Sequence, residues 1–462
     1  MTTLIFILLF SFSYGIEAGI RAAANFSTIV AFKDNLLPII VDNIKEIVLK
    51  DIKGSNGPLY FHLRKVVFYP AKILPSQVKI NLVENKNEIK MRVEGLSGKG
   101  NFDGTWEFLF LDGNFYGTVS INGVSSEMTT KISNDENGRL NLIMKDTILY
   151  ITANNIQITF HGSIIEKVLN FLEPVIKLLM LNDLARNIER VIPQIVNELF
   201  KQLAAKIPYT IDIGHDLVMR MKFPESPIVN NNNLVMDIEG CIVDKNDKCP
   251  DYKSSPYPKR DLNTTKGIYL FVNDYPFKTA LESAYKKDLL NMYYVFDSPL
   301  INVSLYCYMM KVPALNIKQR FKGKAPFNFI VTLNPMCNVT AKNKIILMTF
   351  NMNGDVTGEI LPVVNDQLIH FQVLNVALHN LKVDNPNGHS MNWLKNMIQP
   401  LLNRGMHVLN LHLKKYGFPL PYMKELKLTE VEVGIKDYIE LLGVPIINIT
   451  NSDFSPINFL TL

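Results

Sequence analysis

The longest regular pattern of apolar residues covers positions 163–207, where they recur every three or four positions with charged residues between them. This spacing predicts an amphipathic helix, and Pro174 and Pro193 predict kinks in it. At about 1.5 Å per residue the helix would be roughly 65 Å long, so we expect it to lie along an elongated structure. A second helix with this kind of pattern is predicted at residues 392–416.

Before each of these helices, apolar residues alternate with polar ones, which predicts antiparallel strands. In the first half a helix at 19–48 precedes predicted strands at 60–68, 77–83, 88–94, 105–111, 115–121, 140–144 and 148–159. In the second half a helix at 275–290 precedes strands between 293 and 381, and strands resume from 424. The order helix, strands, helix, strands occurs twice. The predicted fold class is α+β, with curved antiparallel sheets packed on long helices.

Turn signals separate several of the predicted strands. They are Asp112-Gly113-Asn114, Asn122-Gly123, Asn137-Gly138 and Asn353-Gly354. Residues 95–100 predict a flexible hairpin loop, because they lack the glycine spacing of a nucleophile elbow or a phosphate loop. Residues 223–260 contain five prolines and predict a linker with one strand at 234–240.

The N-terminus has the pattern of a secretory signal peptide at residues 1–15. Residues 4–12 are apolar, and small residues follow at Ser13 and Gly15. No later segment has about 18 uninterrupted apolar residues, so we expect a soluble, secreted, extracellular protein. Sequons for N-glycosylation fit this expectation and begin at Asn25, Asn263, Asn302, Asn338 and Asn448. Asn25 is expected to be unusable, because it falls in the predicted first helix.

The four cysteines all lie in the second half of the chain, at Cys241, Cys249, Cys307 and Cys337. In an oxidising compartment an even number of cysteines favours disulfides. The pairing Cys241–Cys249 and Cys307–Cys337 is favoured, although the sequence leaves three connectivities open. No metal site is expected, because there is no CxxC motif and no nearby pair of histidines.

Charge and side-chain chemistry argue against several function classes. A net charge of +5 is mild for 462 residues, and the basic residues are scattered, so no nucleic acid partner is expected. The eight histidines are dispersed, and we predict no catalytic residues and no cofactor. Asp244, Asp247 and Asp251 are interpreted as part of a solvated linker, since no calcium-loop pattern follows them.

Apolar surface is the remaining feature of the sequence that could serve a function. Side chains of apolar helices that lie along a curved sheet could either fill the space between helix and sheet or leave a tunnel there. At about 0.8 kcal/mol per buried methylene, sheltering a chain of about sixteen carbons is worth roughly 12 kcal/mol relative to water. A long dry groove would therefore carry a lipid without any catalytic chemistry.

Several motifs resemble a known family. Residues 417–421 (Gly-Phe-Pro-Leu-Pro) resemble the C-terminal region of the bactericidal/permeability-increasing, lipopolysaccharide-binding and plasma lipid-transfer proteins. Residues 268–270 and 273–275 look like the start of that family's second domain. Residues 73–78 (Ile-Leu-Pro-Ser-Gln-Val) are similar to a short motif of its first domain. The order of elements matches over nearly the whole chain after the signal peptide.

The resemblance implies a boomerang of two elongated barrels with kinked long helices, joined by a central sheet, each barrel with an apolar pocket for a phospholipid. It implies an N-terminal lipid-binding barrel at 16–222, a linker and central sheet at 223–262, and a C-terminal lipid-binding barrel at 263–462. The side chains that we expect to line the pockets are Ile29, Leu36, Ile40, Val175, Ile176, Leu179, Leu281, Met397 and Leu401.

Two departures from the family matter. The family's first-domain disulfide cannot form, since no cysteine precedes Cys241 and Ile188 stands roughly where one would be expected. The region that matches the lysine-rich tip carries Asp103, Glu107 and Asp112 instead. Binding of lipopolysaccharide is therefore less well supported than lipid carriage.

We accordingly predict a secreted lipid-binding or lipid-transfer protein without enzymatic activity. Its expected partners are phospholipid or another lipid, and membrane surfaces that it touches transiently. An antimicrobial or pattern-recognition protein that binds bacterial envelope lipids is the alternative. A secreted lipid hydrolase would need a Ser/His/Asp set that the sequence does not offer.

Overall fold

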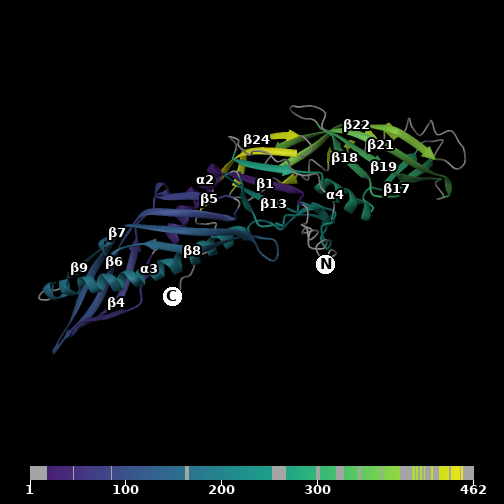
Figure 1. Cartoon of the computed structure of the whole chain (residues 1–462). Helices are drawn as coiled ribbons and strands as arrows, with labels where there is room; N and C mark the ends of the chain where they lie inside the picture. The colour runs from purple at the N-terminus through teal and green to yellow at the C-terminus, as the bar shows by residue number, and fades with distance from the viewer. Residues whose placement is uncertain are drawn as a thin grey trace, which may run out of the picture.

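The computed structural model describes residues 18–450 with gaps. The gaps are 45, 85, 162–165, 231, 252–266, 298–301, 319–326, 342–344, 366–367, 385–397, 401, 404–405, 408–409, 412–417, 420–425, 436–438 and 448. Figure 1 shows an elongated molecule, with the strands of the two halves at opposite ends and a sheet containing β1, β13 and β24 between them. The predicted signal peptide lies outside the described residues.

The end built by the first half, here called the N-terminal lobe, contains a sheet of eight antiparallel strands. Its order is β2-β4-β6-β7-β8, with β3 on β4, β5 on β6 and β9 on β7. The strands are β2 (Ile47–Val48), β3 (Ile52–Asn56), β4 (Leu59–Pro70), β5 (Val78–Val83), β6 (Glu88–Phe108), β7 (Leu111–Asn134), β8 (Leu140–Tyr150) and β9 (Ile156–His161). Short 3-10 turns, η1 (Pro75–Gln77) and η2 (Ala153–Asn155), precede β5 and β9.

Two helices pack on this sheet, α2 (Phe26–Asn43) and α3 (Glu166–Ala205). The predicted long helix is confirmed, since α3 has 40 residues and both predicted prolines lie inside it. It is about 60 Å long and lies along the sheet in Figure 1. Its apolar side chains, among them Ile176, Met180 and Leu184, pack against buried residues of the sheet, as helical periodicity requires of a helix with one buried side.

A central sheet joins the two lobes. Its order is β12-β13-β1-β15-β25-β24, and its strands come from both halves of the chain. They are β12 (Ile228–Asn230), β13 (Asn233–Ile238), β1 (Ile20–Asn25), β15 (Ile268–Val272), β25 (Ile439–Ile447) and β24 (Leu426–Ile435). A smaller sheet, β10-β11-β14, contains β10 (Thr210–Gly214), β11 (Leu217–Arg220) and β14 (Ile242–Asp244).

The second half builds the other end, here called the C-terminal lobe. Its sheet has the order β16-β17-β20-β21-β19-β18, with β22 on β21 and β23 on β22. The strands are β16 (Met292–Asp297), β17 (Asn302–Met309), β18 (Ala314–Lys318), β19 (Phe327–Leu333), β20 (Pro335–Ala341), β21 (Ile346–Asn365), β22 (Leu368–Asp384) and β23 (Phe418–Pro419). The lobe begins with helix α4 (Tyr275–Lys286), and of the predicted helix at 392–416 the structure describes helical residues at 398–400, 402–403, 406–407 and 410–411.

The duplicated plan predicted from the sequence has a counterpart in the central sheet. β1 and β15 are antiparallel neighbours, with Ala22 opposite Leu270. Each leads directly into the first helix of its half, β1 into α2 and β15 into α4. The two halves therefore diverge from adjacent strands in opposite directions.

The predicted helix at 19–48 is wrong at both ends. Residues 20–25 form β1, which is hydrogen-bonded on both sides, to β13 and β15. Three consecutive alanines favour a helix locally, but pairing in the middle of the central sheet overrides this propensity. The helix begins only after Asn25, whose side chain accepts a hydrogen bond from the backbone N–H of Thr28 at 2.9 Å. At the other end, Ile47 and Val48 form β2.

Most of the predicted turns are wrong, because the glycines of their motifs lie inside long strands. Residues 95–100 lie inside β6, where Gly98 leaves room for the ring of Phe68. Residues 112–114 lie in β7, and the turn before it is at residues 109–110. This turn divides the predicted strand at 105–111 between the end of β6 and the start of β7. Gly123 and Gly354 occupy irregularities of β7 and β21. Only Asn137-Gly138 forms the expected turn, between β7 and β8.

The proline-rich stretch at 223–260 is more ordered than the predicted linker with one strand. Three strands, β12, β13 and β14, fall within it, and the first two belong to the central sheet. Both favoured disulfides are present: Cys241 pairs with Cys249, and Cys307 pairs with Cys337. Among the described residues, no helix is long and apolar enough to cross a membrane.

Candidate functional site

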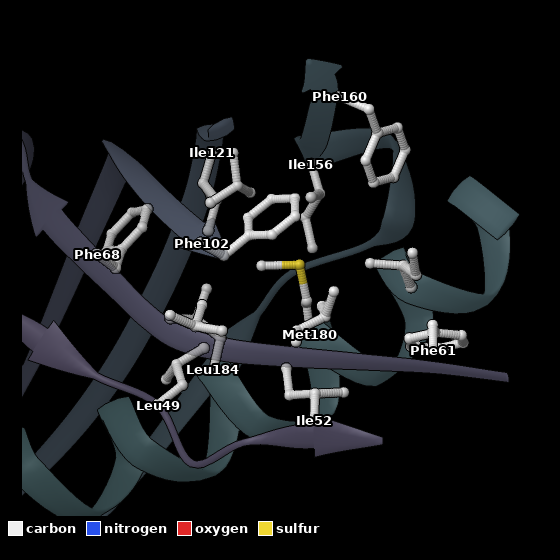
Figure 2. Packing of buried hydrophobic residues seen from close by; sticks show 14 of the residues in the cluster. Leu49, Ile52, Phe61, Phe68, Phe102, Ile121, Ile156, Phe160, Met180 and Leu184 are labelled. Carbon is white, nitrogen blue, oxygen red and sulfur yellow. The ribbon is translucent and has the colours of Figure 1, made fainter. Parts of the chain in front are cut away.

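A small cavity of about 10 Å³, close to the space that one water molecule needs, lies between α3 and the sheet of the N-terminal lobe. Its lining is entirely apolar and comes from four strands or their flanks and one helix: Leu49, Val66, Phe68, Val119, Ile121, Ile156, Met180 and Leu184. Figure 2 shows Met180 extending from α3 into the middle of this group, toward Phe102 and Ile156. The site can therefore exclude water but offers no group for acid–base, nucleophilic or metal chemistry.

The α3 residues predicted to bind lipid pack in the same apolar cluster but do not line the cavity. Ile176 is fully buried, while Val175 and Leu179 are partly buried against the cluster. The lining residues Met180 and Leu184 lie four and eight positions after Ile176, on the same helix face. The predicted residues thus share a helix face with Met180 and Leu184, the two α3 residues that line the cavity, and their role in lipid binding stays a prediction.

The predicted residues of α2 lie outside the cavity as well. Ile29 is buried with Leu82 and Val229, next to the central sheet. Leu36 is buried in a cluster with the second half of α3, and Ile40 packs against the same cluster. The predicted face of α2 therefore packs against the second half of α3, and the predicted residues of the first half of α3 lie in a different cluster.

In the C-terminal lobe the predictions are only partly covered by the described residues. Leu281 lies on α4 and is partly buried. Met397 and Leu401 lie outside the described residues. The proposed pocket of this lobe therefore stays a prediction.

A second apolar cluster continues the interior of the N-terminal lobe toward the central sheet, and we call it the methionine cluster. Its buried members are Leu37, Val78, Val93, Met128, Met144 and Val196, and Met91, Leu96 and Ile40 are among the partly buried residues packed on it. Leu96 also packs on the cluster that contains the cavity. The interior is thus continuous from the cavity to the place where α2 and α3 meet.

The far end of this lobe is an exposed apolar turn. Phe110 is 98% exposed, and its neighbours Leu109 and Leu111 are 63% and 64% exposed. Glu107 and Asp112 lie opposite each other just behind the turn. Two of the three acidic residues predicted for the tip, Glu107 and Asp112, therefore lie at the tip. The third, Asp103, lies further back along β6 and forms an ion pair with Lys65 at 3.4 Å.

Glu239, Cys241 and Cys249 lie close enough together to hold a metal ion, but the two cysteines form a disulfide with each other and offer no thiolate ligand. The Oε2 atom of Glu239 lies 3.4 Å from Sγ of Cys249. Burial raises the pKa of Glu239, and Lys222 and Arg220 oppose this shift. Asp244 pairs with Lys287, and this pairing lowers the pKa of Asp244. Asp244 is therefore part of an ion pair at the end of β14 and not, as predicted, of a solvated linker.

The sequons fall in different environments. Asn25 caps α2 instead of lying inside a helix, and its side chain is engaged with Thr28 and Ser27. Asn338 lies in β20 and accepts a hydrogen bond from Thr349 Oγ1 at 2.8 Å. Asn302 begins β17, while Asn263 and Asn448 lie outside the described residues. Glycosylation stays a prediction.

No family model matches the chain. Human phospholipid transfer protein is 20% identical over 268 residues, which are 57% of this chain and 52% of that protein. The chain thus matches about half the length of this relative. The crystal structure of lipopolysaccharide binding protein is similar over 93% of this chain and 99% of that chain, with a TM-score of 0.59 and 15% identity.

These comparisons confirm two predictions. The fold class is confirmed, because the curled antiparallel sheets and the few helices match the boomerang fold of lipopolysaccharide binding protein over nearly the whole chain. The resemblance to the family of bactericidal/permeability-increasing, lipopolysaccharide-binding and plasma lipid-transfer proteins is confirmed by the two similarities together.

Proposed function

We propose that this chain is a secreted lipid-binding protein, without enzymatic activity, that shelters phospholipid acyl chains in the N-terminal lobe and transfers them between lipid surfaces. The observation that carries the proposal is the cavity beneath α3, because all the residues that line it are apolar. The name of the human relative, phospholipid transfer protein, supports the same function.

The size of the cavity indicates how a lipid would enter. Its volume of about 10 Å³ is far below the roughly 300–1,000 Å³ of ordinary small-molecule pockets. An acyl chain must therefore displace side chains, and Met180 is suited to this because methionine is unbranched and flexible. Each buried methylene returns about 0.8 kcal/mol, which offsets the cost of the rearrangement.

The exposed turn at residues 109–111 is the surface that we propose contacts lipid particles or membranes. Apolar side chains with this exposure gain free energy by entering a lipid interface. Glu107 and Asp112 would stand at the headgroup level and repel anionic lipids, so we expect contact with zwitterionic surfaces. The same charges disfavour the alternative of a receptor for anionic bacterial lipids at this tip.

Secretion is part of the proposal. Two disulfides within the described residues are consistent with an oxidising compartment, where such bonds persist. The predicted signal peptide and the sequons agree with this.

Transfer between vesicles tests the proposal. Donor vesicles carry a self-quenched fluorescent phosphatidylcholine, acceptor vesicles carry none, and the secreted full-length protein is added at catalytic amounts. The proposal expects dequenching that increases with protein concentration. A rate equal to that of vesicles alone, with correctly folded protein, would contradict it.

A further inference from the structure

Two hydroxyl groups are buried in the wall of the apolar interior without a hydrogen-bond partner among the described residues. Ser126 is 0% exposed and Thr130 is 2% exposed, and neither Ser126 Oγ nor Thr130 Oγ1 has a partner. An unsatisfied buried hydroxyl typically costs about 1–3 kcal/mol, so a native protein rarely keeps one without a use for it.

Both hydroxyls lie on the inner face of β7. Ser126, Met128 and Thr130 alternate with partly exposed residues, as one face of a strand must. Ser126 is opposite Val93 and Leu149 on the neighbouring strands, and Thr130 is opposite Met144. Their surroundings are therefore the apolar side chains of the methionine cluster.

Helix α3 does not satisfy these hydroxyls, although it presents polar side chains to the same wall. Asn197 accepts a hydrogen bond from the backbone N–H of Met144 at 2.7 Å. Glu189 accepts one from the backbone N–H of Leu149 at 3.3 Å. The helix thus supplies acceptors to the backbone of β8 and leaves the hydroxyls of β7 facing apolar groups.

We propose that Ser126 and Thr130 are hydrogen-bonding anchors for the uncharged oxygen atoms of a lipid held in the N-terminal lobe. This inference rests on the proposed function and specifies the ligand further, as a lipid with ester-linked acyl chains. A hydroxyl donates well to an ester carbonyl and carries no charge that would select an anion.

The spacing assigns a separate role to each hydroxyl. Ser126 lies five residues after Ile121, a residue of the cavity, which is roughly 15 Å along the strand. Acyl chains in the cavity would therefore place their ester groups near Ser126. Thr130 lies about 13 Å further on, too far to share the same oxygen atom, and faces oxygen atoms of the head group. The methionines around them can rearrange to admit the ligand.

Competition between two phosphatidylcholines of equal chain length tests the inference, one with ester-linked chains and one with ether-linked chains. Full-length protein is equilibrated with vesicles that contain both in equal amounts, reisolated, and analysed for the two bound lipids by mass spectrometry. The wild type should retain the ester lipid in roughly twofold to tenfold excess, the range expected for a neutral hydrogen bond. Ser126→Ala should bring the ratio close to one, and Thr130→Val should lower the loading of both lipids.

Matched controls use the same substitutions on the outer face of β7. Ser125→Ala and Thr129→Val should keep the wild-type loading and ratio. Ser126→Ala and Thr130→Val should melt at or above the wild-type temperature without lipid, because each removes an unsatisfied polar group. A marked loss of stability in both would show a structural role and overturn the inference.

The ratio of bound ester lipid to bound ether lipid distinguishes a failure of this inference from a failure of the proposed function. Equal retention of both lipids by the wild type, or an unchanged ratio in Ser126→Ala, would overturn the anchoring role while lipid binding stands. Failure of the folded wild type to take up either lipid would overturn the proposed function as well.

Discussion

Glu107 and Asp112 face each other across β6 and β7, one pair behind the turn that ends the N-terminal lobe. Directly opposed like charges destabilise a pair of strands, typically by several tenths of a kcal/mol. Together with the exposed Phe110, the pair forms an apolar tip with an acidic base. A tip of this kind is suited to uncharged lipid surfaces and poorly suited to anionic ones.

Reversing this charge should change the preferred surface. The double variant Glu107→Lys/Asp112→Lys is expected to bind vesicles with anionic lipid more tightly than the wild type, by at least about 30-fold, since each lysine near such a surface contributes about 1 kcal/mol. Cosedimentation at low and high salt measures the effect, which salt should weaken. Binding to zwitterionic vesicles is the control and should change little. Tight, salt-sensitive binding of lipopolysaccharide by the wild type would contradict the proposed role of the tip.

The apolar part of the tip should determine adsorption to zwitterionic vesicles. Phe110→Ser removes the most exposed aromatic side chain of the turn and should weaken adsorption by roughly 2 kcal/mol, or about 30-fold. Leu178→Ser is the matched control, because Leu178 is an exposed apolar residue on the outer side of α3. Equal adsorption of the two variants in a flotation assay would show that the turn is not the contact surface.

The disulfides should contribute unequally to stability. Cys307 and Cys337 are paired residues of adjacent strands and lie 30 positions apart, while Cys241 and Cys249 lie 8 apart. The chain-entropy treatment then gives about 3.5 kcal/mol for the longer loop and about 2.5 kcal/mol for the shorter one. Paired Cys→Ala variants and urea unfolding measure the difference. A larger loss from removing Cys241–Cys249 would contradict this order.

Glu239 should make the protein less stable as the pH rises out of the acid range. Burial raises the pKa of Glu239 above its usual value of about 4.5. Stability is therefore greatest below the pKa of the unfolded state and falls as the pH rises through the pKa of the folded state, because the folded protein must then bury a carboxylate. Glu239→Gln should remove this fall and stabilise the protein at neutral pH. The exposed Glu225→Gln is the control, and identical pH profiles of the two variants would contradict the prediction.

The sequence predicts the elements of this fold better than their ends. Helix α3 and most strands were identifiable because their periods of 3.6 and two are set by burial on one side. Residues 20–25 were assigned wrongly because a run of alanines says nothing about which distant strands, β13 and β15, will pair with it. Gly98 and Gly354 were misread as turn signals because a glycine also serves close packing and strand irregularities.

The candidate site was predictable only as a helix face. Ile176, Met180 and Leu184 share that face, but which of them reaches a cavity depends on the sheet opposite, for example on Phe68 and Ile156. Ser126 and Thr130 gave no signal, since a hydroxyl in a strand is ordinary until its burial and its lack of a partner are known.

The central claim, that lipid occupies the apolar interior beneath α3, is tested most directly by native mass spectrometry of the protein after incubation with phosphatidylcholine vesicles. Met180→Phe puts a rigid ring at the centre of the apolar lining and should block an acyl chain there; its thermal melt is measured in parallel to establish that it folds. Leu178→Phe makes a similar change on the outer side of the helix. We predict phospholipid adducts on the wild type and on Leu178→Phe, and at least a fivefold loss on Met180→Phe, an effect of about 1 kcal/mol. A wild type without adducts, or equal adducts on Met180→Phe, would contradict the account.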